Sequence, residues 1–268
     1  MIKDITIGQY FPGESFIHKM DPRIKIILTI LFIVMLFVVN SLLGFLLLGL
    51  VVVFFVLLSK ISIKLILKSI KPLMFIIIFT AIFNVLYGTG APLFPNISWL
   101  AWIRVDGVLR AVFMIIRIIL LIVSTSFLTY TTSPVMLTDA IEKLLSPLTF
   151  FKIEVHDFAM MMTIALRFIP TLIDETDKII NAQKARGADF ETGNIFKRAK
   201  ALIPILIPLI VSAFKRAYEL ADAMECRCYN GGKERTKYKV YNFSYRDYIA
   251  IIFMIIVLVG VILINILV

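Results

Sequence analysis

The sequence predicts an all-α, polytopic membrane protein with about five transmembrane helices and a large helical insert in the cytosol. Hydrophobic residues make up 60% of the 268 residues, charged residues only 17%, and the mean hydropathy is +0.95. These values lie outside the range of soluble globular domains. Apolar runs long enough to cross a bilayer recur along the chain. A long polar stretch with helical character interrupts them before the last run, which predicts the insert.

The first predicted element is a hairpin of two spans within residues 24–58. This run contains few strongly polar residues, and it is too long for a single crossing. Asn40 and Ser41 stand near its middle, so we expect them to form the turn. Asp21 followed by Pro22 is a typical helix start, and it predicts where the first span begins.

Three further spans are predicted at about residues 72–87, 108–130 and 248–268. A basic linker joins the second span to the third, and its lysines share one helical face. Either this linker lies along the anionic inner leaflet, or it is simply a positively charged loop. The lysines concerned are Lys60, Lys64, Lys68 and Lys71.

Basic residues also predict the orientation of the spans. Arg23 and Lys25 precede the first span, and the lysine linker follows the second, whereas the loop at residues 88–107 carries only Arg104 and Asp106 as charges. Because cytosolic loops are enriched in Lys and Arg, the N-terminus is expected in the cytosol and the C-terminus outside.

This topology divides the chain into three parts: residues 1–130 with the first four spans, the cytosolic insert at 131–247, and the last span at 248–268. Inside the insert, residues 201–214 are fully apolar but contain two prolines and have basic residues at both ends. Such a run is short for a crossing. We expect a kinked helix docked beneath the membrane, and a crossing here would move the C-terminus to the other side.

Composition excludes several classes of function. The net charge of +10 matches the basic cytosolic loops of a membrane protein, and no groove-reading motif accompanies it, so no nucleic-acid partner is expected. Cys226 and Cys228 are too close in sequence for an unstrained disulfide. With only His18 and His156 as further soft ligands, no metal site is predicted. No phosphate-binding G-x-x-x-x-G-K-[ST] motif occurs, so the chain itself is not expected to bind ATP.

Two polar helices in the insert end in the same way. The first carries an isoleucine, an alanine and an arginine at i, i+3 and i+7, which is one helical face. Gly187 follows the arginine where a helix end needs a left-handed residue. A shift of 41 residues superposes a second helix on the first, and Asn230 and Gly231 follow its arginine. The two faces are Ile179, Ala182 and Arg186, and Leu220, Ala223 and Arg227.

Two interpretations of these arginine tips remain open. An arginine in the last helical turn interacts favourably with the helix dipole, so each tip could be an ordinary helix end. Alternatively, small alanines let helices approach closely, and a guanidinium offers a rigid fork for carboxylate or carbonyl acceptors. The repetition favours a docking surface.

Arg117 lies about ten residues into the fourth predicted span. A cation at this depth is costly and usually faces the helix bundle or a partner. It is either a structural arginine satisfied within the chain or a contact to a membrane partner.

Four segments together make the sequence similar to a known family: "YFPGESFIHKMDPRIK", "RFIPTLIDE", "AQKARGADF" and "AFKRAYELADAME". They resemble the transmembrane T component (EcfT) of energy-coupling factor (ECF) transporters, which are ABC importers for vitamins and related micronutrients. The resemblance covers about residues 9–229. In that family two Ala-Arg-Gly motifs end the coupling helices. The first is matched by Ala185, Arg186 and Gly187, and the second reads Cys226, Arg227 and Cys228.

The resemblance implies a non-catalytic subunit with defined partners. Each arginine would enter a groove on one of two ABC ATPase subunits of the EcfA and EcfA′ type, and those subunits would bind ATP and Mg, so the chain would need no cofactor. A separate S component would bind the substrate, and membrane lipid would surround the spans. Arg117 would then be structural or a contact to the S component.

Two other classes stay in consideration. One is an ion-coupled secondary transporter without ATPase partners, although proton coupling normally uses intramembrane carboxylates, which the predicted spans lack. The other is an intramembrane enzyme, for which no nucleophile–base pair is visible.

Overall fold

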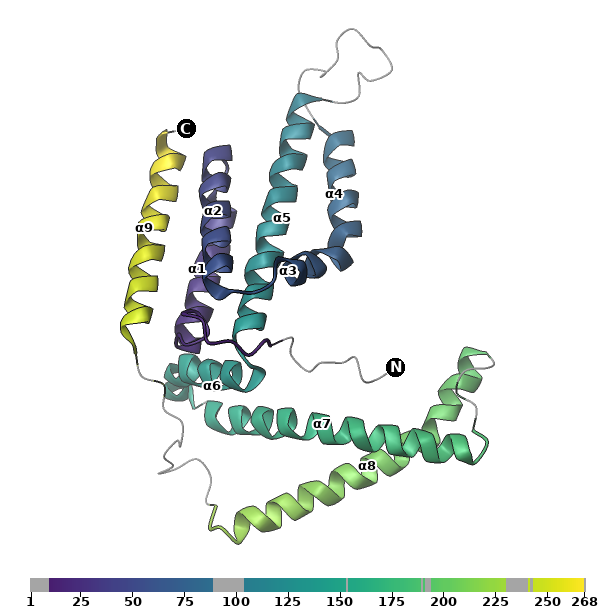
Figure 1. The fold of residues 1–268 in the computed structure, drawn as a ribbon. Helices are drawn as coiled ribbons and strands as arrows, with labels where there is room; N and C mark the ends of the chain where they lie inside the picture. Colours follow the sequence, from purple (N-terminus) through teal and green to yellow (C-terminus); the bar gives the residue numbers. More distant parts are fainter. Residues whose placement is uncertain are drawn as a thin grey trace. The chain divides into compact units, whose positions relative to one another are not determined.

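The computed structural model describes most of the chain, and all the secondary-structure elements in the described part are helices (Figure 1). The described residues are 10–88, 104–152, 154–188, 190, 194–229, 241 and 243–267. The predicted all-α class is therefore confirmed. The chain divides into two compact units, one formed by Gly8–Ala140 with Val240–Val268 and the other by Ile141–Lys239. We call them the span unit and the crossed-helix unit.

The span unit contains the helices expected from the sequence. Asp21 caps the first of them by accepting a hydrogen bond from the N–H of Arg23 (2.9 Å), and Ser41 caps the second by accepting from Gly44 (3.3 Å). The predicted start at Asp21 and the predicted turn at Asn40 and Ser41 are thus both confirmed. The helices are α1 (Pro22–Val38), α2 (Leu42–Ser59), α3 (Ile63–Ile70), η1 (Lys71–Leu73), α4 (Met74–Leu86), α5 (Val105–Thr131) and α9 (Tyr245–Leu267).

The core of the span unit forms where α1, α2, α5 and α9 pack against one another. Its largest fully buried side chains are Met35 and Leu36 of α1 and Phe45 and Leu48 of α2. Outward-facing side chains of the same helices are also apolar, for example Phe37 at 60% exposure. Helices that are apolar on all sides are typical of membrane spans.

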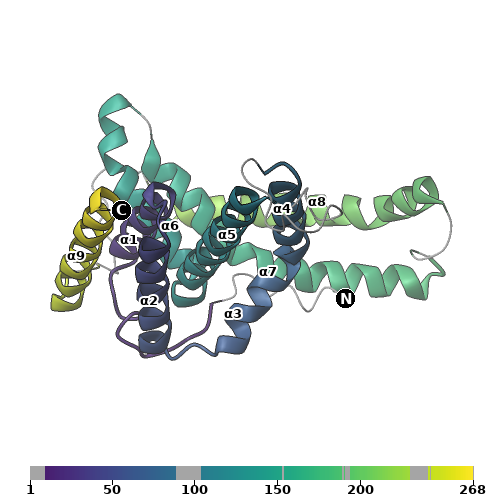
Figure 2. The same cartoon turned by 90° about the horizontal axis from the view of Figure 1, so that it is seen from above.

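The crossed-helix unit is built around two helices of 31 residues each, α7 (Val155–Ala185) and α8 (Ile195–Glu225), which pack against each other (Figure 2). A 3₁₀ helix, η3 (Ser146–Phe151), precedes α7, and α6 (Pro134–Leu145) contains the boundary between the two units.

The helix expected at residues 201–214 is present, but it extends well beyond this run on both sides. These residues form the middle of α8, whose interior contains Pro204 and Pro208. The helix continues past residue 214 because the following residues, including Lys215, Arg216 and Ala217, are strong helix formers. Because α8 is longer than the apolar run, the short length of the run no longer argues against a membrane crossing. The basic residues on both sides of the run still do.

Within the described part of the chain, six helices are long and apolar enough to cross a membrane, judged by length and composition alone. The least apolar are the candidate segments of α7 and α8, with mean hydropathies of 1.2 and 1.6, against 2.0–3.3 for the others. With 17 residues, α1 is one residue shorter than this criterion requires. The six are Leu42–Ser59, Ile63–Leu86, Val105–Thr131, Val155–Ala185, Lys200–Glu225 and Tyr245–Leu267.

Candidate functional site

Helix α7 ends in a Schellman motif, with Arg186 as its C-cap residue. The N–H of Gly187 donates to the carbonyl of Lys184, and the N–H of Ala188 donates to the carbonyl of Gln183, both at 3.0 Å. These are the two hydrogen bonds that define the motif. Gly187 has a φ of +85°, where a β-carbon would be strained. The left-handed glycine predicted from the sequence is confirmed.

The end of α8 repeats this geometry around Arg227. The N–H of Cys228 donates to the carbonyl of Glu225 (2.8 Å), and the N–H of Tyr229 donates to the carbonyl of Met224 (3.0 Å). Each of these four residues lies 41 positions after its counterpart at the end of α7. The internal repeat therefore extends to the hydrogen bonds of the helix end.

Cys228 fills the left-handed position of the second tip, with a φ of 57°. The sequence analysis did not predict a left-handed residue at this position. The available signal was the 41-residue shift, which superposes Cys228 on Gly187. Asn230 and Gly231 lie outside the described residues.

The two helices contact each other at equivalent positions of the repeat. Glu175 of α7 accepts hydrogen bonds from the guanidinium of Arg216 (2.9 Å) and from the hydroxyl of Ser212, both on α8. Glu175 and Arg216 are themselves 41 residues apart. The crossing therefore lies at the same point of each repeat, and each tip follows it by 11 residues (175 to 186 and 216 to 227).

The two predicted faces have matching exposure. Ile179 and Leu220 are half-buried, whereas Ala182 and Ala223 are exposed. The tip residues Ala185, Arg186, Gly187, Cys226, Arg227 and Cys228 are all exposed. Neither Arg186 nor Arg227 forms an ion pair with a carboxylate of the described residues. Both guanidinium groups are thus open to acceptors on another molecule.

Because both tips share one cap geometry, substitutions at the two left-handed positions should differ in their effect on stability. Gly187→Ala should destabilise the first tip by about 1–2 kcal/mol because of its positive φ. No atom lies within 4 Å of an added β-carbon, so a steric clash adds nothing. Cys228→Gly should leave the second tip unchanged or slightly more stable, because relief of strain offsets the entropy of glycine.

Hydrogen exchange of the Ala188 and Tyr229 amides would measure both effects, since each closes the outer hydrogen bond of its motif. Faster exchange at Tyr229 in Cys228→Gly would show that the two ends are not equivalent.

Arg117 on α5 binds the turn between α1 and α2. Its guanidinium donates to the carbonyl of Val39 (2.8 Å) and lies over the ring of Phe45, 5.4 Å from the centroid. The Val39 carbonyl follows the last turn of α1, where a cation is favourable. This geometry gives Arg117 a structural partner within the chain, while its buried Nε has no hydrogen-bond partner among the described residues.

The N-terminal segment "PGESFIHK" folds around the ring of His18, which gives it a physical explanation that the sequence alone did not provide. Nε2 of His18 donates to the carbonyl of Phe11 (3.0 Å), so Nδ1 accepts from the hydroxyl of Ser15 (2.7 Å). A β-carbon on Gly13 would lie 2.9 Å from the ring, which requires glycine there. Burial, followed by the nearby charge of Lys25, lowers the pKa of His18, so the ring is neutral at pH 7.

Asp247 joins the starts of α1 and α9. One carboxylate oxygen accepts from the N–H of Asp21 (3.0 Å) and the other from the N–H of Ser244 (2.8 Å), and the residue is 1% exposed. Arg23 forms an ion pair with Asp21 (2.8 Å) and donates to the carbonyl of Tyr241 (2.8 Å). Burial raises the pKa of the Tyr241 phenol, which therefore stays neutral.

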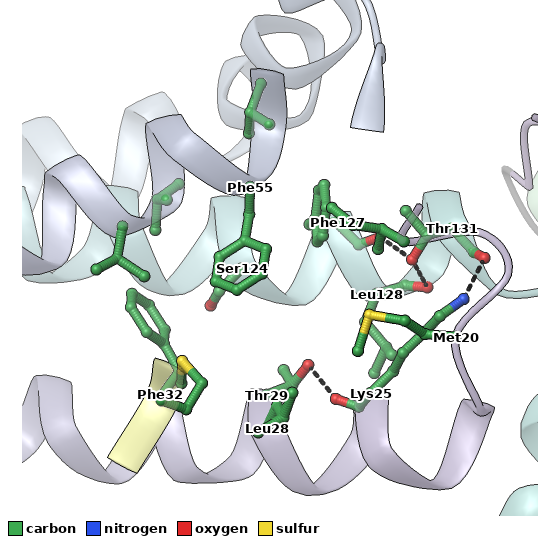
Figure 3. A pocket seen from close by; sticks show the side chains of 15 residues that line it. Met20, Lys25, Leu28, Thr29, Phe32, Phe55, Ser124, Phe127, Leu128 and Thr131 are labelled. Carbon is green, nitrogen blue, oxygen red and sulfur yellow. Dashed lines mark hydrogen bonds between the residues drawn. The ribbon is translucent and has the colours of Figure 1, made fainter. Parts of the chain in front are cut away.

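A cavity of about 80 Å³ in the span unit is lined mainly by apolar side chains (Figure 3). Its one charged group is the ammonium of Lys25, which donates to the carbonyl of Thr131 (3.0 Å), the hydroxyl of Thr132 (3.4 Å) and the carbonyl of His18 (3.4 Å). The hydroxyls of Thr29 and Ser124 donate to carbonyls of their own helices. With its polar groups satisfied, this cavity is part of the packing and not a site for polar substrates.

Comparison with known proteins places these features in context. The family model described as "CbiQ: Cobalt transport protein" matches residues 13–238. Three similar proteins carry the name "Energy-coupling factor transporter transmembrane protein EcfT". The protein from Ruminiclostridium cellulolyticum is 54% identical over 248 residues (92% of each chain), and that from Clostridium kluyveri is 52% identical over 251 residues (93% of each). The protein from Bacillus subtilis is 42% identical over 256 residues (96% of each).

Proposed function

The chain belongs to the CbiQ family, as a transmembrane component of energy-coupling factor transporters, and from this premise we propose how it works. It receives ATP-driven motion from two ABC ATPase subunits through α7 and α8 and passes that motion to a substrate-binding S component. The transported substrates are vitamins or related micronutrients, and the S component selects among them. The chain itself is a non-catalytic subunit, and the ATPase partners hold ATP and Mg.

The observation that carries this proposal is the pair of equivalent arginine tips. Arg186 and Arg227 share one backbone geometry, are exposed, and follow the crossing of α7 and α8 by the same number of residues. At 1.5 Å per residue, 11 residues place each tip about 16 Å along its helix from the crossing. Helices α7 and α8 run in roughly opposite directions, so their C-terminal tips lie at opposite ends of the helix pair (Figure 1). Two related grooves on two related ATPase subunits would suit such a pair.

The surface of α8 supports a second partner. Large apolar side chains are exposed along it, and among its described side chains only Ile205 is a buried apolar residue. Contiguous exposed apolar surface usually marks a protein or membrane interface. We assign this surface to the S component, which must move with α8 during transport. The residues concerned are Leu202, Ile203, Leu206, Ile207, Ile210, Val211, Phe214 and Tyr218.

The proposed location is the cell membrane, with the N-terminus in the cytosol and the C-terminus outside. The basic residues of the lysine linker and the few charges at 88–107 support this orientation. The lower mean hydropathy of α7 and α8 supports a cytosolic position for both, as does the partly exposed ion pair between Glu175 and Arg216.

The competing function is an ion-coupled secondary transporter without ATPase partners. Proton coupling would need carboxylates or histidines within the spans. In the described parts of α1, α2, α4, α5 and α9, the carboxylates are Asp106 and Asp247, both in the first turn of their helix. Neither is placed near the middle of a span, which favours the T-component function.

Affinity purification of the tagged chain from its own membranes, followed by mass spectrometry, separates the two functions. We expect two ABC ATPase chains and a small membrane protein to be recovered in comparable amounts. The membranes would be solubilised gently, so that the chain stays intact. Recovery of the intact chain without any ATPase would favour the secondary transporter. The recovered membrane protein would also identify the substrate class.

A further inference from the structure

Helix α3 connects the end of the apolar helix α2 to the start of the apolar helix α4. α2 ends at Ser59, and α4 begins at Met74, after η1. In Figure 1, α2, α4 and α5 run in a similar direction, whereas α3 runs across them near one end of α4. A helix that joins two spans at one end of both must lie at the boundary between hydrocarbon and water.

The surface of α3 has three distinct faces. Ile66 is 8% exposed and packs with Val56 of α2 and Val123 of α5. Ile63 and Leu67 are apolar but 61% and 60% exposed. At 100° per residue, Lys64 and Lys68 lie beside this exposed apolar face, on the side away from Ile66, while Lys60 precedes α3 and Lys71 follows it. All four lysines are exposed: Lys60, Lys64, Lys68 and Lys71.

The charge of this segment is not compensated within the described part of the chain. Residues 24–104 contain no Asp or Glu. None of the four lysines forms an ion pair with a described carboxylate. Four uncompensated positive charges thus lie next to exposed apolar side chains. This combination matches a surface that is apolar at its centre and anionic outside it.

We propose that α3 lies in the membrane interface and that the four lysines on and beside it bind the headgroups of anionic phospholipids. Ile63 and Leu67 enter the acyl region, and the lysine side chains extend to the phosphate level, as long cationic side chains do at helix ends. Specific binding of anionic lipid would fix the depth of the α2–α4 connection. The proposal goes beyond the T-component function and does not depend on ATPase or S-component partners.

Depth measurements test the position of α3. Spin labels would be attached to Leu67→Cys and, separately, Lys68→Cys, after Cys226 and Cys228, which are exposed, have been replaced by serine. The full chain would be reconstituted in vesicles that contain phosphatidylcholine and phosphatidylglycerol. We expect the label at residue 67 to collide mainly with oxygen and the label at 68 mainly with a water-soluble nickel complex. Equal access of the nickel complex to both labels would overturn the proposal.

Lipid selectivity tests the charge. The purified chain would be titrated with spin-labelled phosphatidylglycerol and spin-labelled phosphatidylcholine. Replacing all four lysines by glutamine should reduce the preference for phosphatidylglycerol by about fivefold or more, since a single lysine near the surface contributes about fivefold. The charge-retaining control, with arginine at the same four positions, should keep it.

An unchanged preference in the glutamine variant would overturn the proposal. The same conclusion would follow if inorganic phosphate at equal concentration displaced the labelled lipid, because the lysines would then bind a free anion and not a membrane surface.

Discussion

Replacing both tip arginines, Arg186→Ala together with Arg227→Ala, is expected to abolish ATPase association and substrate uptake. Both guanidinium groups are exposed in the isolated chain and would become desolvated in the two ATPase grooves. Truncating one partner of such a buried contact typically costs about 2–5 kcal/mol, much of it from acceptors left unpaired. Two such losses remove most of the free energy that holds a typical micromolar or tighter complex. The S component should remain in the membrane fraction with the chain.

The single variants should behave differently from the double variant. Either tip alone can hold one ATPase, so Arg186→Ala or Arg227→Ala should retain part of the ATPase while uptake falls. Lysine at the same position should restore little, because an ammonium lacks the planar fork of a guanidinium. Co-purification and uptake in the same membranes would measure both effects.

A matched control removes equal charge from the same helices but away from the tips: Lys178→Ala with Lys215→Ala, both exposed. This control should keep its ATPases. If the double arginine variant also keeps them and transports normally, the arginines are helix caps worth about 0.3–1 kcal/mol each. The proposed coupling role would then be withdrawn.

Local signals made most of the helix ends predictable from the sequence. Asp21 and Ser41 each accept a hydrogen bond from a backbone N–H two or three residues later, which depends only on the adjacent chain. Gly187 is similar, since a left-handed backbone position follows from the end of one helix. The long apolar runs that predicted the spans are equally local, because hydrocarbon imposes helix on any segment that crosses it.

Features that depend on distant pairing were not predictable. The contact between Asp21 and Asp247 joins residues 226 positions apart, and neither residue type nor spacing points to it. The contact between Glu175 and Arg216 could not be predicted for the same reason, although the 41-residue repeat already related the two helices that carry these residues. The full length of α8 was not apparent from the apolar run at residues 201–214, because hydropathy changes after residue 214 while helix propensity does not.

The second large effect is expected at Asp247, where Asp247→Ala should destabilise the span unit by about 3–5 kcal/mol. The carboxylate is 1% exposed and accepts hydrogen bonds from two backbone N–H groups, those of Asp21 and Ser244. Removing it leaves one buried and one partly buried donor unpaired, at about 1–3 kcal/mol for each buried group. The cationic side chain of Lys25 also loses a nearby negative charge.

Asp247→Asn should have a smaller effect, because one amide oxygen can still accept from one of the two N–H groups while the amide NH₂ opposes the other. The matched control is Asp106→Ala, which removes an exposed aspartate from the first turn of α5. That position should cost only the helix-dipole contribution, about 0.3–1 kcal/mol. Thermal unfolding in detergent would rank the three variants, and hydrogen exchange at residues 243–250 should rise in Asp247→Ala. Equal losses for Asp106→Ala and Asp247→Ala would mean that Asp247 acts only as a helix N-terminal charge, and that the start of α1 is held by the ion pair of Arg23 with Asp21 and not by α9.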